Sequence, residues 1–171
     1  FGADGAPLPG LVDHLTFAVD GFKIALFGLT TATTMTKSSP APARIVDPLP
    51  AAARAAAALR AEGADVVVAL AHTNRREDAA LLAQGAVDVV LSGDDHDLRA
   101  QHASGRLLIE SASQGDHIAI VTLSLARGDR RDGTRAELLP SVRFVASATI
   151  DPDPQIAAAV VADGADAAVL T

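Results

Sequence analysis

Three short apolar runs separated by two helical stretches constrain the fold of this chain most tightly. The runs cover residues 22–29, 66–71 and 87–92, and each has the length and apolar character of a buried strand. Helical patterns occupy residues 47–63 and 76–84 between them. Strands that alternate with helices over short connections form a parallel sheet with right-handed crossovers. We therefore predict that the three runs are parallel neighbours in one sheet.

Local signals give bounds for the two helices. Asp47 has the residue type of an N-cap and Pro48 stands at the first helical position, while Gly63 fits the C-terminal stop. The second helix is predicted over residues 76–84, with a glycine directly after it. Residues 30–42 are rich in Thr, Ser and Pro and are predicted to be a loop.

The spacing of apolar runs changes in the second part of the chain. Residues 106–110 and 117–125 follow one another without a helix between them. Residues 128–133 are charged and bounded by glycines, which predicts a hairpin turn before a strand near 141–146. We therefore predict antiparallel strands here, followed by a helix over residues 155–163.

Composition narrows the class of protein. The chain has 171 residues, 49% of them hydrophobic but only 3% aromatic, so one domain with a core of Ala, Val, Leu and Ile is predicted. No apolar run is long enough to span a membrane. The net charge of −7 and the lack of a basic cluster argue against nucleic-acid binding. The first ten residues do not resemble a signal peptide, but the chain begins with Phe1, so a signal could lie upstream.

Polar residues follow two of the predicted strands. His72 comes directly after the second run, and the third run is followed by a Gly-Asp-Asp-His-Asp sequence that contains Asp94 and His96. The carboxyl ends of parallel strands lie at one edge of a sheet, where ligands gather. Imidazole and carboxylate together suit Zn, Mn or Fe. His72, Asp94 and His96 are therefore candidate metal ligands.

Each of these residues also has a purely structural interpretation. A single histidine at a strand end is usually a polar loop residue, and Asp95 and Asp97 have the residue type that caps turns. Asn74 and Asp78 are candidates for capping the following helix, and this is the interpretation we favour for Asp78. The remaining histidines lie in no cluster and are interpreted as ordinary surface or strand residues: His14, His102 and His117.

The two strand ends carry a resemblance to a known family. The segment GADVVVALAH ends at His72 and the segment VDVVLSGDDH ends at His96. This arrangement resembles the later part of calcineurin-like metallophosphoesterases, in the branch that contains the 5'-nucleotidases. The resemblance implies that His72 is a metal ligand and that His96 is the second histidine of a Gly-His-x-His metal motif. Asp94 stands where the family usually has the first histidine.

The resemblance also implies a fold and a function. The expected fold is α/β, a part of a four-layer α/β/β/α sandwich, with parallel strands followed by antiparallel strands. Residues 1–150 would form the C-terminal half of the catalytic domain, and residues 151–171 would begin a linker helix toward a substrate domain. The implied activity is hydrolysis of phosphate esters, with nucleotides in catabolism as the favoured substrates and two divalent metal ions as cofactors. Exported family members suggest the periplasm or the cell surface.

One departure from the family concerns the first half of the domain. The family has an Asp-x-His motif, a further Asp and an Asn-His pair there, and nothing before Gly21 matches them; Asp13-His14 has the wrong spacing. The chain alone is therefore expected to bind metal weakly and to be inactive, with the missing half as its partner. The alternative is a non-catalytic remnant or regulatory module that keeps the fold. A flavodoxin-like binding domain ranks last, because residues 28–31 form no glycine-rich phosphate loop.

Overall fold

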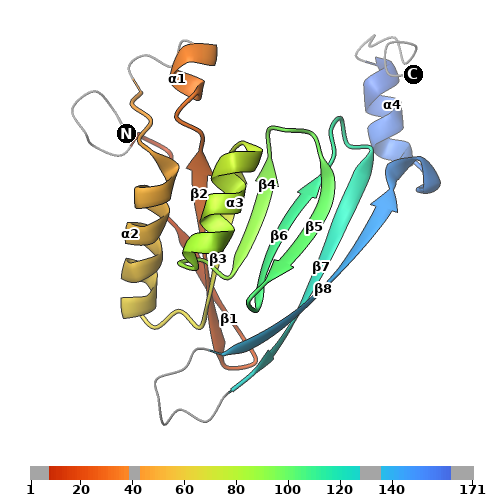
Figure 1. Cartoon of the computed structure of the whole chain (residues 1–171). Helices are drawn as coiled ribbons and strands as arrows, with labels where there is room; N and C mark the ends of the chain where they lie inside the picture. The colour runs from red at the N-terminus through yellow and green to blue at the C-terminus, as the bar shows by residue number, and fades with distance from the viewer. Residues whose placement is uncertain (1–7, 39–42, 128–135, 163–171) are drawn as a thin grey trace.

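A computed structural model describes residues 8–38, 43–127 and 136–162. Six strands form one sheet in the order β1-β2-β3-β4-β6-β5, and β7 and β8 form a second sheet (Figure 1). The strands are β1 Leu15–Val19, β2 Phe22–Thr30, β3 Val66–His72, β4 Val89–Gly93, β5 Leu98–Ala103, β6 Arg106–Ser111, β7 His117–Ala126 and β8 Glu137–Ala146. The helices are α1 Thr34–Lys37, α2 Pro48–Ala61, α3 Arg75–Gln84 and α4 Pro154–Ala162, with a 3₁₀ turn at Ser147–Thr149.

The predicted parallel core is confirmed. Strand β2 pairs parallel with β3, and β3 pairs parallel with β4. The connections run through α2 and α3, which cover the same face of the sheet (Figure 1). Asp47 caps α2, since its side chain accepts a hydrogen bond from the Leu49 backbone N–H, and Pro48 begins the helix as predicted.

The antiparallel prediction was wrong for one strand. Strand β6 joins the main sheet and runs parallel to β4, although no helix separates them in the sequence. The reason is β5, which we did not predict: it returns along the sheet and pairs antiparallel with β6 through a turn at Ser104 and Gly105. Both turn residues have positive φ, 51° and 73°. An edge strand and its hairpin turn therefore take the place of a crossover helix.

Two smaller elements were also missed. Strand β1 pairs antiparallel with β2 through Asp20 and Gly21, both with positive φ, the residue pair typical of a two-residue hairpin turn. The segment 30–42, predicted to be a loop, contains the single-turn helix α1 at Thr34–Lys37. Hydrogen bonds between threonine side chains stabilise the turn that leads into α1, including one between the hydroxyl groups of Thr30 and Thr34 at 3.2 Å.

The main sheet has a hydrophobic core on each face. On one face, alanines and leucines of α2 and α3 pack against β2, β3, β4 and β6. On the other face, Val66, Val68, Val89, Leu107 and Ile109 pack against the second sheet. Strand β7 alternates half-buried and exposed residues, as a strand with one solvent face must. Small aliphatic side chains, rather than aromatic ones, fill both cores and allow the layers to pack closely.

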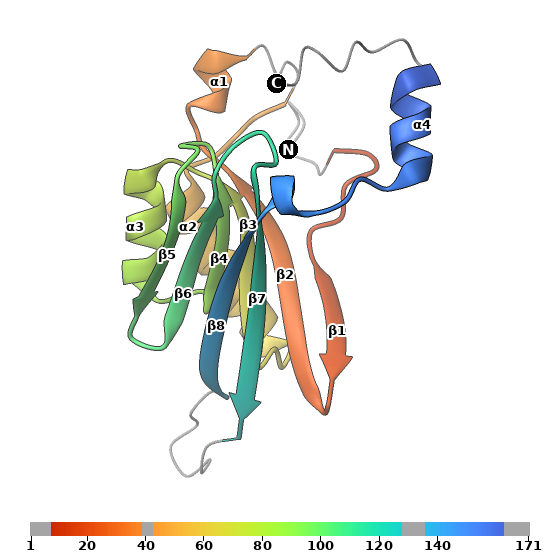
Figure 2. The same ribbon diagram turned by 90° about the vertical axis from the view of Figure 1, so that its right-hand side faces the viewer.

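The described residues form three layers: helices, six-stranded sheet and two-stranded sheet (Figure 2). The α/β class is thus confirmed, and the four-layer sandwich that the resemblance implies stays a prediction. Strands β7 and β8 pair antiparallel along their full length, as predicted, while the turn predicted at 128–133 lies outside the described residues. Helix α4 projects away from the sheets, and within the described ranges no helix is long and apolar enough to cross a membrane.

Candidate metal centre

The candidate centre is built on the adjoining ends of β3 and β4. In the parallel register, His72 pairs with Gly93, so the segment 94–97 begins beside the His72 imidazole. A side chain at Gly93 would place its Cβ 3.8 Å from His72 Nδ1, which shows that the ring lies over this glycine. The backbone carbonyl of His72 also accepts a hydrogen bond of 2.8 Å from the Thr31 N–H. Three strand ends are thus fixed relative to one another.

His72 and Asp94 meet at this edge. His72 Nε2 lies 3.3 Å from Asp94 Oδ1. The His72 side chain is 62% exposed and that of Asp94 only 13% exposed, so the carboxylate lies deeper and the imidazole lies at the surface. Asp94 has φ of 113°, a conformation that few non-glycine residues adopt. Asp94 therefore combines an uncommon backbone conformation with a side-chain contact to His72.

Lys37 is a third member of this group that the sequence did not point to. Its Nζ lies 3.6 Å from the same Asp94 oxygen. Lys37 ends α1, the helical turn that was predicted to be loop. Asp94 Oδ1 thus faces an imidazole and an ammonium group. The negative charge of this carboxylate attracts cationic groups to this edge of the sheet.

His96 lies in the same loop but apart from this contact. It is exposed and has φ of 63°. Within residues 8–38, 43–127 and 136–162, the one group of three acidic or histidine side chains close enough to share an ion is Asp78, Asp95 and Glu110. The structure therefore brings His72 and Asp94 together, and the role of His96 as a ligand stays a prediction.

The donor chemistry of His72 and Asp94 fits a divalent ion. An imidazole nitrogen and a carboxylate oxygen, 3.3 Å apart, are a donor pair that borderline ions such as Zn or Mn accept. The partly exposed imidazole leaves room for further ligands. Two donors hold an ion weakly, so a complete site needs others from His96 or from outside the described residues.

Behind this centre lies a buried polar network around Asp78. The capping interpretation of Asp78 was wrong, because Asn74 is the N-cap of α3 and forms a capping box with Glu77. Asp78 lies one turn further and is fully buried. Its Oδ1 accepts hydrogen bonds from Thr73 Oγ1 at 2.5 Å and from Ser92 Oγ at 2.7 Å.

The other oxygen of Asp78 accepts a hydrogen bond from Arg99. The distance from Arg99 Nη2 to Asp78 Oδ2 is 2.5 Å, and Arg99 Nε lies 3.4 Å from Glu110 Oε2. Burial raises the pKa of Asp78 above its ordinary value, and the hydrogen bonds from Thr73 and Ser92 oppose this. The network thus holds two buried carboxylates around one guanidinium.

The sheet register explains why these side chains meet. Ala71, Ser92, Glu110 and Arg99 lie in one row across β3, β4, β6 and β5. Residues in one row of a sheet share a face, and this row faces α3, which carries Asp78. Arg99 and Glu110 were missed by sequence reasoning. The available signal was Glu110 itself, an acidic residue that directly follows the apolar residues 107–109.

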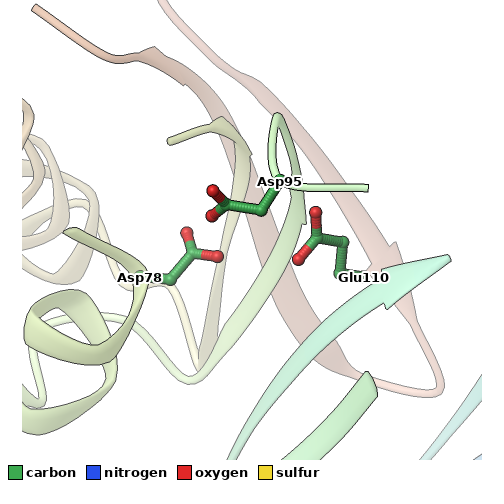
Figure 3. A group of neighbouring side chains, drawn as sticks. All are labelled: Asp78, Asp95 and Glu110. Carbon is green, nitrogen blue, oxygen red and sulfur yellow. The ribbon is translucent and has the colours of Figure 1, made fainter. Parts of the chain in front are cut away.

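The loop after β4 links this network to the candidate centre. Asp95 is exposed, yet its carboxylate lies within 4.8 Å of those of Asp78 and Glu110 (Figure 3). Asp97 accepts a hydrogen bond of 2.5 Å from Arg75, and its carbonyl accepts one from the Ala112 N–H. Asp97 therefore holds the loop to α3 and to the end of β6, which goes beyond the turn-capping role considered for it.

Comparison with solved structures identifies the fold. The sulfate thiohydrolase SoxB from Thermus thermophilus matches with a TM-score of 0.71 and 22% identity, over 94% of this chain and 30% of that one. A 5'-nucleotidase precursor, also from Thermus thermophilus, matches with a TM-score of 0.73 and 21% identity, over 88% of this chain and 33% of that one. The calcineurin-like phosphoesterase YfkN from Bacillus subtilis matches with a TM-score of 0.67 and 20% identity, over 90% and 56%.

The fold is therefore that of the calcineurin-like metallophosphoesterases of the 5'-nucleotidase type, as the resemblance implied, and the length is consistent with the C-terminal half of that domain. No family model and no curated protein matches the sequence. The chain spans about a third of the length of the SoxB and 5'-nucleotidase chains. Identities of 20–22% establish the fold alone, and the neighbours differ in the reactions their names describe.

Proposed function

We propose that this chain contributes metal ligands to a phosphate-ester hydrolase with nucleotide-like substrates, and that His72, Asp94 and His96 are those ligands. The observation that carries the proposal is the 3.3 Å approach of His72 Nε2 to Asp94 Oδ1 at the carboxyl edge of β3 and β4. Ligands bind at this edge in open α/β sheets. The nucleotidases and phosphoesterases among the structural neighbours support the substrate class.

The chemistry assigns a role to each residue. Divalent ions, when bound, activate water and neutralise phosphate charge in such hydrolases. His72 offers a neutral imidazole nitrogen, and Asp94 offers a carboxylate whose negative charge favours a cation. Because a carboxylate replaces a histidine at position 94, the site carries more negative charge than one with imidazoles alone. This favours a harder ion such as Mn over Zn.

The active protein needs residues beyond those in this chain. The chain spans about a third of the SoxB and 5'-nucleotidase chains. We therefore include in the proposal a complementary half-domain that supplies the remaining ligands, and a substrate domain after residues 151–171.

The rival proposal is a non-catalytic module that keeps the fold. It is favoured by the exposed position of His96. The two proposals differ in what they expect of Asp94: a ligand in the first and a turn residue in the second. Metal content therefore separates them.

The test compares variants at position 94 of the protein that contains this chain, because His72 and Asp94 alone would hold an ion weakly. We expect Asp94→Ala to lower the Mn²⁺ bound per chain after dialysis, because it removes a charged ligand, and Asp94→His to keep it, because imidazole is also a ligand. Asp97→Asn, which changes a neighbouring acid outside the proposed set, is the matched control. Elemental analysis gives the metal content, and phosphate release from AMP by the protein that contains this chain gives the activity. Equal metal content in all four proteins would refute the assignment of Asp94.

A further inference from the structure

We propose that Asp78, Asp95 and Glu110 form a second cation site, separate from His72, Asp94 and His96, for a hard divalent ion such as Mg²⁺, Mn²⁺ or Ca²⁺. Oxygen atoms of these three carboxylates lie within 4.8 Å of one another. They come from three different elements: α3, the loop after β4, and β6 (Figure 3). The fold itself, rather than one acidic stretch of sequence, brings them together.

The first argument is the buried carboxylate of Glu110, which lacks hydrogen bonds within the described ranges. It is 1% exposed, and neither of its carboxylate oxygens has a hydrogen-bond partner within the described ranges. Glu110 Oε2 forms an ion pair with Arg99 Nε at 3.4 Å, but this contact is not a hydrogen bond. A buried carboxylate without hydrogen bonds is costly, and ions or water commonly satisfy such groups. Glu110 points into the space that Asp78 and Asp95 share (Figure 3).

The second argument is the local balance of charge. The cluster holds three carboxylates, and one guanidinium, that of Arg99, pairs with two of them, so the cluster has an excess of negative charge when all are ionised. Arg75 also interacts electrostatically with Asp95 and Glu110, but its guanidinium forms an ion pair with Asp97. A divalent cation would neutralise the negative charge that the arginines leave uncompensated.

Asp78 keeps capacity for a ligand bond despite its hydrogen bonds. A carboxylate has about four lone-pair sites. Thr73 and Ser92 occupy two sites on Oδ1, and Arg99 occupies one on Oδ2. One site on Oδ2 remains, together with both oxygens of Glu110 and the carboxylate of the exposed Asp95.

The ligand types determine the class of ion. All the donors in this cluster are carboxylate oxygens, which suit hard ions, whereas His72 and His96 suit borderline ions. Asp95 lies between Asp94 and His96, two residues with positive φ. An ion that binds Asp95 to the buried Asp78 and Glu110 would therefore hold this loop in place. The inference does not depend on the proposed function.

The test measures Mn²⁺ binding in a chain from which the first site has been removed. In a His72→Ala/Asp94→Asn/His96→Ala background, we expect one Mn²⁺ to bind, followed as the loss of the free-ion signal in electron paramagnetic resonance. Adding Asp95→Asn should weaken binding by about tenfold, because ligand charge sets affinity at oxygen sites. Adding Glu110→Gln should weaken it further.

Two controls make the result decisive. Asp97→Asn, an acid in the same loop outside the cluster, keeps an oxygen that can accept from Arg75 and should leave Mn²⁺ affinity unchanged. Asp95 is exposed, so Asp95→Asn tests the site even if Glu110→Gln fails to fold, which circular dichroism would reveal. Absence of Mn²⁺ binding in the background chain, or equal affinity with and without Asp95→Asn, would overturn the proposal. Neither result bears on the His72 and Asp94 assignment, since that site is absent from these proteins.

Discussion

At the scale of single residues, Asp78 shows how burial changes the behaviour of an acid. Its carboxylate is removed from water between α3 and the sheet, and it accepts hydrogen bonds from Thr73, Ser92 and Arg99. Burial disfavours the charged form more than these donors favour it, so the pKa is raised from 3.8. The folded protein therefore binds a proton at Asp78 more tightly than the unfolded chain does.

This shift predicts a dependence of stability on pH. Between pH 3.8 and the raised pKa, the folded state holds more protons at Asp78, so its contribution to stability falls as pH rises through this window. Asp78→Asn cannot ionise, and it should therefore gain stability relative to the wild type as pH rises. Urea unfolding across this range, with a chelator present, measures the difference. A constant difference between the two proteins would show that Asp78 does not titrate in this window.

The same residue shows a limit of sequence reasoning. Asp78 follows Asn74 by four positions, and either type could cap a helix. The choice depends on Ser92 and Arg99, which approach from other strands, so no local pattern could settle it. His72 and Asp94 were predictable because strand ends meet at one edge. Lys37 was not, since its position depends on how residues after β2 turn back.

At the scale of elements, the start of α3 is fixed by a capping box. The Asn74 side chain accepts hydrogen bonds of 3.1 Å from the N–H groups of Arg76 and Glu77, and the Glu77 carboxylate accepts one from the Asn74 N–H. Glu77 also accepts a hydrogen bond from Thr31, beyond the end of β2. The cap thus joins the helix to the sheet edge that carries His72.

Removing the Asn74 cap should lower the free energy of unfolding of the domain. We expect Asn74→Ala to lower the free energy of unfolding by about 1 kcal/mol, because two helical N–H groups lose their acceptor. Asn74→Ser should retain most of the stability, since serine is also a good N-cap. Chemical denaturation of the three proteins checks this. Equal losses for alanine and serine would mean that the side-chain oxygen contributes little.

Element prediction succeeded where the period of apolar residues was clear. Runs of valine with alanine or leucine predicted β3 and β4, and Asp47 with Pro48 predicted the start of α2. Prediction failed at β5, whose sequence LRAQHA has little apolar character and lies on the sheet edge. Because β5 was missed, β6 was assigned to the wrong group of strands. An error in one edge strand therefore changed the predicted topology of its neighbour.

At the scale of the whole molecule, the domain boundary can be tested through α4. Residues 154–161 of this helix are exposed, and it lies away from both sheets (Figure 1). A chain that ends at Ile150 should therefore unfold within about 2 °C of the complete chain, since little apolar area is lost. Calorimetry gives both midpoints. A clearly lower midpoint for the shorter chain would place α4 within the domain rather than in a linker.

The second sheet has two strands and the first has six, so part of the first sheet stays uncovered on that side. This uncovered part indicates where further strands could pair with the second sheet. Leu15, Phe17 and Val19 of β1 are 48–54% exposed and project from the same face of the main sheet as the residues that β7 and β8 cover. Strand β7 ends beside this region, where Arg127 stacks on Phe22 and bonds to the Gly21 carbonyl. A further strand paired to the free edge of β7 would lie over Phe17. The complementary half-domain that we propose is therefore expected to extend the second sheet from β7, because that edge adjoins the uncovered apolar surface of β1.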